Sequence, residues 1–318
     1  MPAAVALALA AAVPLVFLFR SWCSSPTSNR RRCRCGREVY SDDDDALLLN
    51  LAEPHTRWFN MGYWEHTRSF PDACAELCRR VARAARLEPH QRICEVGYGS
   101  GDSTLLLARE FSPSSYVGLT SLASQCKTAN RRAFQEGLPA DRFRLLQGDA
   151  ARDLDQLDAS SAGAVLAVDC AYHFTTRSAF LSSAHRLLTP SGTLSLTDLL
   201  LPPTRLPWHA LVLLRLLFYL AGAPWQNLLT PSAYRAHLIA HGFDEHTIEM
   251  EDLSSRVWPG FCNFVREREE RLGRGGRGVF GGKWNGLVRY ARVVEWYSGV
   301  RSGEPKLRFY LVSARKAG

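Results

Sequence analysis

The stretch "ICEVGYGSGDST", Ile93 to Thr104, decides the fold of this chain. It begins as a short apolar run, breaks into three glycines at alternate positions, and then continues into the apolar segment "LLLARE". A strand, a glycine turn and a helix start are typical of a site for a nucleotide-like ligand. Glycine suits such a turn because it adopts positive φ and has no side chain to obstruct the ligand.

The spacing of the glycines narrows the class of ligand. Gly97, Gly99 and Gly101 form a GxGxG pattern, whereas a dinucleotide fingerprint needs a glycine where this chain has Asp102. A diphosphate beside that carboxylate would be repelled, and the turn lacks the GK[ST] ending of a Walker loop. A cationic ligand that carries an amino acid fits better, because Glu95 and Asp102 could face an ammonium and a sulfonium.

The chain around this turn alternates short apolar runs with segments of helical periodicity. Such alternation predicts an α/β fold with a mainly parallel sheet that helices cover on both faces. The expected strands are 92–97, 115–120, 142–149, 162–169, 193–201 and 306–315, and the expected helices are 73–87, 104–110, 124–137 and 177–188.

The composition excludes several classes of protein. The chain has 318 residues, 46% of them hydrophobic, which is enough for one large domain. The net charge is +8, partly from a run of arginines between positions 30 and 37, but no basic stripe with interleaved aromatics indicates a nucleic-acid partner. An anionic membrane surface fits the charge better. Nine scattered cysteines favour reduced thiols, and the pair Cys33 and Cys35 is too small a set for a zinc site.

The N-terminal segment has no charged side chain from Pro2 to Phe19, near the lower limit of ~18 residues for a membrane-spanning helix. A cleaved signal peptide is the alternative, but positive charge normally precedes its apolar core, whereas here the arginines follow. We favour an uncleaved anchor in residues 1–22 and a linker in 23–45, with the C-terminal side in the cytosol. The endoplasmic reticulum is the first candidate membrane, and a mitochondrial membrane is the second.

Residues 55–200 resemble a class I S-adenosylmethionine-dependent methyltransferase. Five elements match in order: "EVGYGSGDST", "VGLTSLASQ", "LLQGDA", "AVDCAYHF" and "LLTPSGTLSLTDLL". The resemblance implies S-adenosyl-L-methionine as the cofactor and a Rossmann-like, seven-stranded sheet within residues 46–318. It also implies that the last strand, "KLRFYLVSAR", is antiparallel and pairs with the region 241–254.

Within this family, the chain looks most similar to the group of cyclopropane fatty acid synthases, sterol methyltransferases and plant small-molecule methyltransferases. Residues 59–65, "FNMGYWE", resemble the aromatic segment that closes over the cofactor in that group. Members often end the second strand with Thr or Ser and a nearby Gln, which are Thr120 and Gln125 here. The resemblance implies cofactor contacts from Phe59, Asn60, Glu95, Gly97, Tyr98, Gly99, Gly101, Asp102, Ser103, Thr120, Gln125, Asp149 and Ala150.

The segment "DCAYHF", residues 169–174, follows the fourth strand, where the acceptor should meet the cofactor. His173 is the candidate general base because its unperturbed pKa is ~6.5. Tyr172 and Asp169 could orient the acceptor or His173, and Asp198 is expected to face the same cleft. Cyclopropane synthases carry a carboxylate where this chain has Tyr172. That difference argues for simple N-, O- or C-methylation of a small-molecule or lipid-like acceptor.

Two later segments, at about 202–232 and 255–300, are expected to form a substrate lid. The apolar stretch 206–225 could be a second membrane span, but Arg215 inside it favours a partly exposed helix near the site mouth. Such a helix could line a pocket for a greasy acceptor or rest on a membrane. Residues 273–286 are rich in glycine and arginine and are expected to form a mobile loop.

Three further questions stay open from the sequence. The aromatic residues Trp58, Phe59, Tyr63 and Trp64 could close the site or pack in the interior. A catalytically silent cofactor-binding scaffold at a membrane is an alternative function. A polyamine synthase-like transferase on the same fold is another, although no acidic pair that would grip a polyamine is evident.

Overall fold

The computed structural model describes residues 49–50 and 56–317, with the backbone alone for residues 272–283. The expected anchor in 1–22 and linker in 23–45 therefore lie outside the described residues. Within the described part, seven strands form one sheet in the order β3-β2-β1-β4-β5-β7-β6. The strands are β1 (Arg92–Val96), β2 (Ser115–Thr120), β3 (Phe143–Gln147), β4 (Ala162–Ala167), β5 (Leu188–Leu200), β6 (Glu249–Asp252) and β7 (Arg308–Arg315).

The sheet confirms the Rossmann-like α/β prediction. Strands β1 to β5 pair in parallel, and β7 runs antiparallel between β5 and β6. The expected return of the last strand to the sheet is therefore confirmed. Strand β5 starts earlier than predicted, and its register with β4 shifts between Ala162 and Ala164. Within this irregular start, Ser191 adopts a positive φ of 61°.

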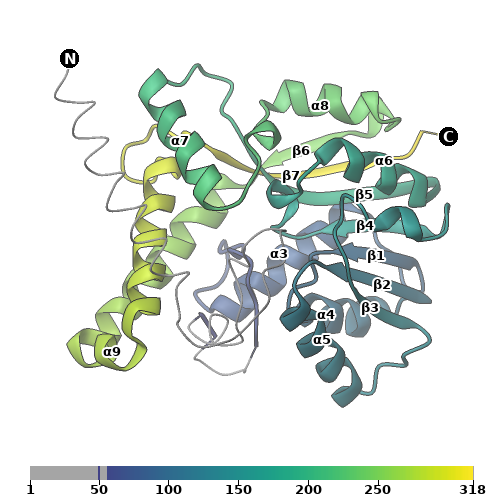
Figure 1. Ribbon diagram of the computed structural model, residues 1–318, viewed down its shortest axis with the longest axis horizontal. Helices are drawn as coiled ribbons and strands as arrows, with labels where there is room; N and C mark the ends of the chain where they lie inside the picture. Colours follow the sequence, from purple (N-terminus) through teal and green to yellow (C-terminus); the bar gives the residue numbers. More distant parts are fainter. Residues whose placement is uncertain (1–48, 51–55, 318) are drawn as a thin grey trace, which may run out of the picture.

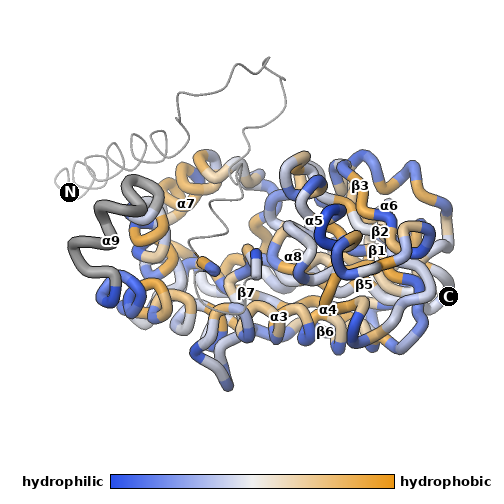
Figure 2. The backbone as a smooth tube through the Cα atoms, turned by 90° about the horizontal axis from the view of Figure 1, so that it is seen from below, coloured by the Kyte–Doolittle hydropathy of each residue, from blue (hydrophilic) through white to orange (hydrophobic). Residues whose placement is uncertain are grey.

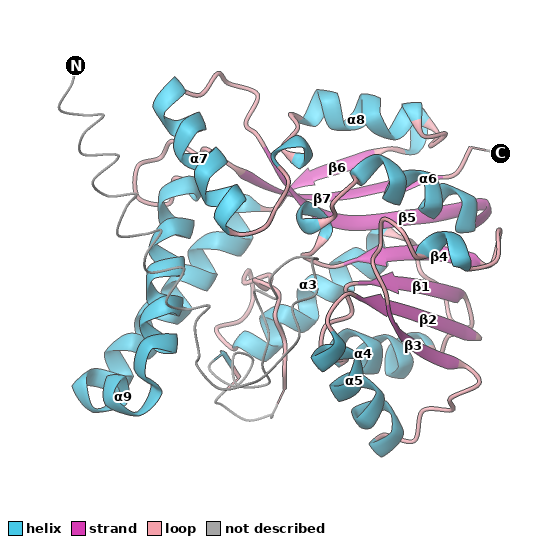
Figure 3. Cartoon of the chain, in the orientation of Figure 1, coloured by secondary structure: helices cyan, strands magenta, loops and turns pink. Residues whose placement is uncertain are grey.

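Helices cover both faces of the sheet (Figure 1), and Figure 3 shows the same layers by secondary structure. The helices are α3 (Phe70–Ala84), α4 (Asp102–Phe111), α5 (Ala123–Gln135), α6 (Arg177–Leu187), α7 (Trp208–Leu220), α8 (Pro231–Ala240) and α9 (Ser254–Ser298). Short 3₁₀ turns are η1 (Leu154–Gln156), η2 (Ala171–His173), η3 (Trp225–Asn227) and η4 (Glu245–Thr247).

The hydrophobic core has two parts, one on each face. Because successive strand residues point to opposite faces, Ile93 belongs to the cluster that includes α3, α4 and α5. Its neighbour Cys94 belongs to the cluster that includes α6 and α8. Strand β7 alternates in the same way, with Phe309 on the first side and Val312 on the second. This two-sided burial explains why the central strands read as continuous apolar runs.

Helix α9 folds back on itself. The rings of Phe261 and Tyr290 lie 6.1 Å apart, and Arg266 Nη2 lies 2.5 Å from a carboxylate oxygen of Glu295. In a straight helix, residues 29 positions apart would be separated by about 43 Å, so the two arms must lie side by side. The prediction of a loop over 273–286 is wrong, because the backbone there is helical.

Helix α7 is shorter than the apolar stretch that predicted it. Pro207 stands at its N-cap and Gly222, with a φ of 67°, follows its end. Among the described residues, no helix has the length and apolar character needed to cross a membrane.

Candidate functional site

The glycine turn joins β1 to α4 at the point where the sheet order reverses direction. From β1 the chain moves to β2 and β3 on one side, and then to β4 and β5 on the other. Open α/β sheets bind ligands in the crevice outside the carboxyl ends of the strands at such a point. The strand, turn and helix predicted from Ile93 to Thr104 are confirmed.

Two of the three glycines are required by packing inside the protein. Gly97 and Gly101 have φ of 76° and 95°. A Cβ at Gly97 would lie 2.5 Å from Cys170 Sγ, and one at Gly101 would lie 3.0 Å from the Cβ of Ala129. These two positions therefore let the turn approach the segment after β4 and the helix α5.

Gly99 is different, because a Cβ there would meet only Phe59 Cδ2, at 3.8 Å. Its φ is 58°, so the backbone is left-handed as well. Since no neighbouring atom crowds this position, packing does not explain the glycine. The open side at Gly99, bordered by Phe59, is where a ligand can approach the main chain closely.

The two acidic residues of the turn already have protein partners. The carboxylate of Glu95 accepts a hydrogen bond from the hydroxyl of Tyr116, and burial raises its pKa to about 7. Asp102 forms a bidentate ion pair with Arg132, with both nitrogen–oxygen distances 2.7 Å. It also accepts a hydrogen bond from the backbone N–H of Arg57 at 3.2 Å. Both carboxylates therefore stabilise the turn through contacts within the protein. Their direct contact with a cationic ligand stays a prediction.

Tyr98 and Ser103 also face the interior. The hydroxyl of Tyr98 donates to the carbonyl of Leu146 at 3.1 Å, and its ring lies where a Cβ of Gly118 would be. The hydroxyl of Ser103 donates to the carbonyl of Tyr98 at 3.4 Å. The side chain of Tyr98 is therefore directed under β2, which leaves its main chain as the part that a cofactor could contact.

The ends of β2 and β3 extend the crevice sideways. At the end of β2, the hydroxyl of Thr120 donates to Gln125 Oε1 at 3.0 Å. After β3, Asp149 accepts a hydrogen bond from the N–H of Ala151 at 2.7 Å, and Ala150 is buried beside it. Because β2 and β3 are adjacent and parallel, these groups lie at the same edge as the glycine turn.

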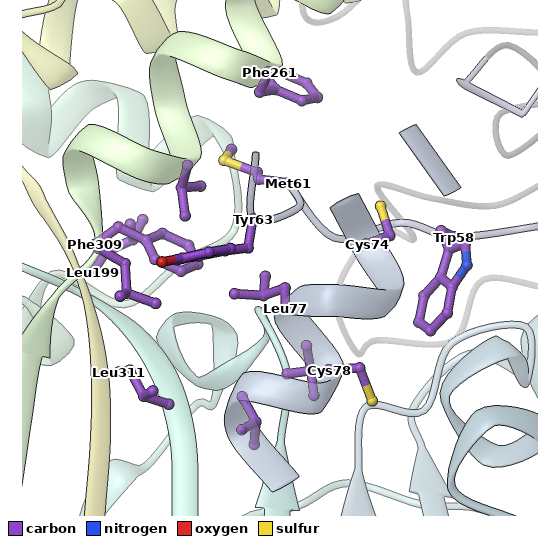
Figure 4. Close-up of a cluster of buried hydrophobic side chains, with 14 of the residues drawn as sticks. Trp58, Met61, Tyr63, Cys74, Leu77, Cys78, Leu199, Phe261, Phe309 and Leu311 are labelled. Carbon is purple, nitrogen blue, oxygen red and sulfur yellow. The ribbon is translucent and has the colours of Figure 1, made fainter. Parts of the chain in front are cut away.

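Most of the aromatic segment packs in the interior. Figure 4 shows Tyr63 among Leu77, Leu199 and Phe309, and Trp58 on the other side of α3 near Cys74 and Cys78. Trp58 and Tyr63 are buried.

Trp64 lies against the ring of Phe264 at 5.5 Å, in a place that only a glycine at position 260 leaves open. Asn60 also turns inward, where its Nδ2 donates to the carbonyl of Cys74 at 3.2 Å. Of the four aromatics, Phe59 is the one beside the open side of the glycine turn.

Asp169 connects the aromatic segment to the end of β4. Its Oδ2 accepts the backbone N–H of Met61 at 2.8 Å, and its Oδ1 accepts the hydroxyl of Tyr172 at 3.2 Å. Its own N–H donates to the hydroxyl of Thr197 at 2.7 Å. The φ of Asp169 is 53°, a left-handed conformation that is uncommon for a residue with a side chain and often marks a functional position.

Burial shifts the pKa values of Asp169 and His173 in opposite directions. Burial raises the pKa of Asp169 to about 7, and the hydrogen bonds from Met61 and Tyr172 oppose this rise. Burial lowers the pKa of His173 to about 4, so its imidazole is neutral at neutral pH. The rings of Tyr172 and His173 lie 4.4 Å apart. A carboxylate with a pKa near neutrality holds a proton more firmly than this imidazole does.

The expectation that Asp198 faces the cleft is wrong. Its carboxylate is fully buried, is paired with Arg177, and accepts the hydroxyl of Tyr234 at 3.0 Å. The guanidinium of Arg177 also lies over the ring of Tyr234, 5.0 Å from its centroid. Asp198 therefore anchors β5 to α6 and α8.

Two residues that the sequence did not single out hold the segment carrying Tyr172 and His173. The buried side chain of Asn227, in η3, donates to the carbonyls of Tyr172 at 3.1 Å and Phe174 at 2.7 Å. Arg177 donates to the carbonyl of Ala171 at 3.3 Å. Asn227 could be suspected only as an amide inside an apolar segment, since the sequence does not reveal burial.

Comparisons with known proteins identify the family. A family model described as a methyltransferase domain matches residues 94–196. A fatty-acid O-methyltransferase of Mycolicibacterium smegmatis is 31% identical over 218 residues, which cover 68% of this chain and 72% of that protein. The chain is a class I S-adenosylmethionine-dependent methyltransferase.

Two other similarities support this assignment. An erythromycin 3''-O-methyltransferase of Saccharopolyspora erythraea is 24% identical to the methyltransferase over 294 residues, which cover 90% of each chain. The structure of the cyclopropane synthase MmaA2 from Mycobacterium tuberculosis superposes with a TM-score of 0.63 at 16% identity, over 86% of this chain and 94% of that one. At that identity, the superposition shows a shared fold.

The cofactor of this methyltransferase is S-adenosyl-L-methionine, and the residues of the turn fit it. The uncrowded side of Gly99 is space that a Cβ would take from a ligand. The same edge of the sheet, at the carboxyl ends of the parallel strands, also carries the hydrogen-bonded pair of Thr120 and Gln125 and the loop at Asp149. The roles of these individual residues remain predictions.

Replacing Gly99 with Asp should lower the affinity for S-adenosylhomocysteine at least ~100-fold, because the side chain would fill the space beside Phe59. Titration calorimetry measures this. Gly137→Asp is the matched control, since Gly137 has a φ of 70° and a Cβ there would meet no atom within 4 Å. Equal affinity in Gly99→Asp and wild type would reject the assignment of the turn.

Asn227→Ala should reduce turnover by roughly tenfold or more while leaving the affinity for S-adenosylhomocysteine unchanged. The substitution removes the amide that donates to both carbonyls, and a lost hydrogen bond costs about 0.5–1.5 kcal/mol, so the segment that carries Tyr172 is held less firmly. The neighbouring Gln226→Ala, at an exposed position, is the control. Turnover in Asn227→Ala equal to that of the control would show that the two hydrogen bonds from Asn227 have no part in catalysis.

Proposed function

We propose that this methyltransferase transfers a methyl group to the hydroxyl oxygen of a small, lipid-like acceptor while tethered to a membrane. The observation that carries the proposal is the Asp169–Tyr172 pair at the end of β4. An O–H acceptor must lose its proton as the new carbon–oxygen bond forms, so a nearby proton acceptor is required. The two relatives described above both methylate oxygen by name, which supports the choice of oxygen over nitrogen or carbon.

Bound S-adenosyl-L-methionine supplies a methyl carbon already activated by a positively charged sulfur. The protein therefore has two tasks, to align the acceptor and to remove its proton. Asp169 is the better proton acceptor, because its pKa of about 7 matches neutral pH more closely than the pKa of His173, about 4. The proton passes from the acceptor hydroxyl to the Asp169 carboxylate, with Tyr172 as the group that orients or relays it.

The proposed acceptor is apolar because the lid is apolar. Helix α7 presents Leu214 and Phe218 to the core cluster that also contains Met61 of the aromatic segment. After α7 the chain continues to η3, where the side-chain amide of Asn227 donates a hydrogen bond to the carbonyl of Tyr172. A lid of this composition favours a hydrocarbon body and leaves one polar group for the Asp169–Tyr172 pair.

We further propose that residues 2–19 anchor the chain in the endoplasmic reticulum with the catalytic domain in the cytosol, a mitochondrial membrane being the second candidate. The uncharged stretch and the arginines after it support this proposal.

The pH dependence of turnover distinguishes the two candidate bases. If the carboxylate of Asp169 takes the proton, turnover is low while the group is protonated and rises with pH through a midpoint near 7. A midpoint near pH 4 would instead assign the proton to His173. The measurement is the rate of methyl transfer from labelled cofactor to an acceptor found by incubating the enzyme with lipid and metabolite extracts.

Asp169→Asn should lower turnover by roughly 10²-fold and abolish the midpoint near pH 7, because the amide cannot accept the proton. His173→Ala should slow turnover less, with little change in the affinity for the cofactor. Both variants are compared by calorimetry with S-adenosylhomocysteine, which controls for folding. Wild-type turnover in Asp169→Asn would remove Asp169 as the base.

Deleting residues 1–22 should release the protein from the membrane fraction, while circular dichroism shows a folded domain. The described core forms from residues after position 48, so the deletion removes none of it. If the truncated chain still sediments with membranes, the tether lies elsewhere in the chain.

A further inference from the structure

Helix α7 has an inward face that packs and an outward face that is open. Its inward side buries three residues spaced one turn apart, with 7% or less of each exposed. They are Ala210, Leu214 and Phe218. An ordinary surface helix would carry mostly polar residues on its other side, whereas the exposed residues of α7 include only two polar ones, His209 and Arg215.

The outward face of α7 gathers large apolar side chains. Trp208, Val212 and Tyr219 are 63%, 60% and 81% exposed. With exposed Arg215, they fall within an arc of about 60° around the helix axis, since each residue turns by about 100°. The other large hydrophobics that are exposed in the described part of the chain are single residues on other segments (Phe134, Ile239 and Val300).

The chain segment that carries this face has a positive charge. No Asp or Glu occurs in the sequence between Asp198 and Asp244, whereas arginines stand at 205, 215 and 235. Arg215 lies over the ring of Trp225, 5.9 Å from its centroid. A face with aromatic residues near both ends of a helix and arginine between them matches the boundary between lipid headgroups and acyl chains. An anionic headgroup layer is the complementary surface.

The length of α7 decides how it meets a membrane. Its 13 residues span about 20 Å, less than the ~30 Å of a bilayer core. The helix therefore suits a position flat on the surface. Figure 2 shows α7 as an apolar stretch at the outside of the molecule.

The start of the described chain lies at the same end of the molecule. The carbonyl of Leu49 accepts a hydrogen bond from Arg268 of α9 at 2.8 Å. Both views place α7 and α9 together at one end, away from β3 (Figures 1 and 2). The 48 residues before Leu49, which include the uncharged stretch 2–19, thus join the domain at the end that carries α7.

We propose that the outward face of α7 docks on an anionic lipid surface and presents the lid to a membrane-borne acceptor. The proposal rests on the membrane tether proposed above, because the tether brings this end of the molecule to the bilayer. Docking buries Trp208, Val212 and Tyr219 among the headgroups, with Arg215 toward the phosphates. Asn227, seven residues after the end of α7, then lies close to the lipid boundary.

The test uses the full chain in vesicles of anionic lipid whose acyl chains carry bromine, which quenches nearby tryptophan fluorescence. The quenched fraction should fall when Trp208 is replaced by Phe and should not fall in Trp284→Phe, because Trp284 is buried in the protein. The double variant Val212→Glu/Tyr219→Glu should lower the quenching of Trp208, whereas Phe134→Glu on α5 should not.

The outcomes separate this inference from the tether. A chain that floats with the vesicles but loses no quenching in Trp208→Phe overturns the docking of α7 and leaves the tether intact. A full chain that does not float at all overturns both. If the double variant instead changes the mass of the detergent-solubilised protein in light scattering, the face pairs two copies, and lipid docking is overturned. If bromolipid vesicles without anionic lipid no longer quench Trp208, the proposed preference for anionic headgroups is supported.

Discussion

The site depends on a reversal in the sheet. The chain leaves β1 toward β2 and β3 on one side and returns to β4 and β5 on the other, so the crossovers diverge above the glycine turn. Open α/β sheets bind ligands in the crevice at such a point. Three backbone positions with positive φ keep the turn tight, and two of them do so by admitting Cys170 and Ala129. What remains uncrowded is the side at Gly99.

The end of the neighbouring strand, β4, carries the proposed base. Asp169 sits in a left-handed conformation, and hydrogen bonds from Met61 and Tyr172 tie it to the aromatic segment and to η2. Asn227 holds η2 from the lid side. The aromatic segment therefore contacts Asp169 directly, and η3 is connected to it through Tyr172. Burial raises the pKa of this carboxyl group to about 7. The burial that accompanies these contacts thus also sets the pKa of the proposed base.

The sequence predicted the parts that depend on local pattern. The strands appeared as apolar runs because both faces of the sheet are covered, and the glycine spacing located the turn. Features set by distant partners were not predictable. Asp198 was misassigned because Arg177 and Tyr234, its partners, are far away in the chain. Residues 273–286 were predicted as a loop because they are rich in glycine and arginine. Contacts between the two arms of α9, such as that of Arg266 with Glu295, are not visible in the sequence. Helix α8, capped by Thr230, was not foreseen.

The central claim is that the main chain at Gly99 receives the cofactor at the tip of β1. A crystal structure of the protein with S-adenosylhomocysteine tests it most directly. The homocysteine portion should lie against the turn at Gly99, and the nucleoside should extend toward Thr120 and Asp149 at the ends of β2 and β3. Density for the ligand at another place, or a Gly99 position that the ligand does not approach, would contradict it.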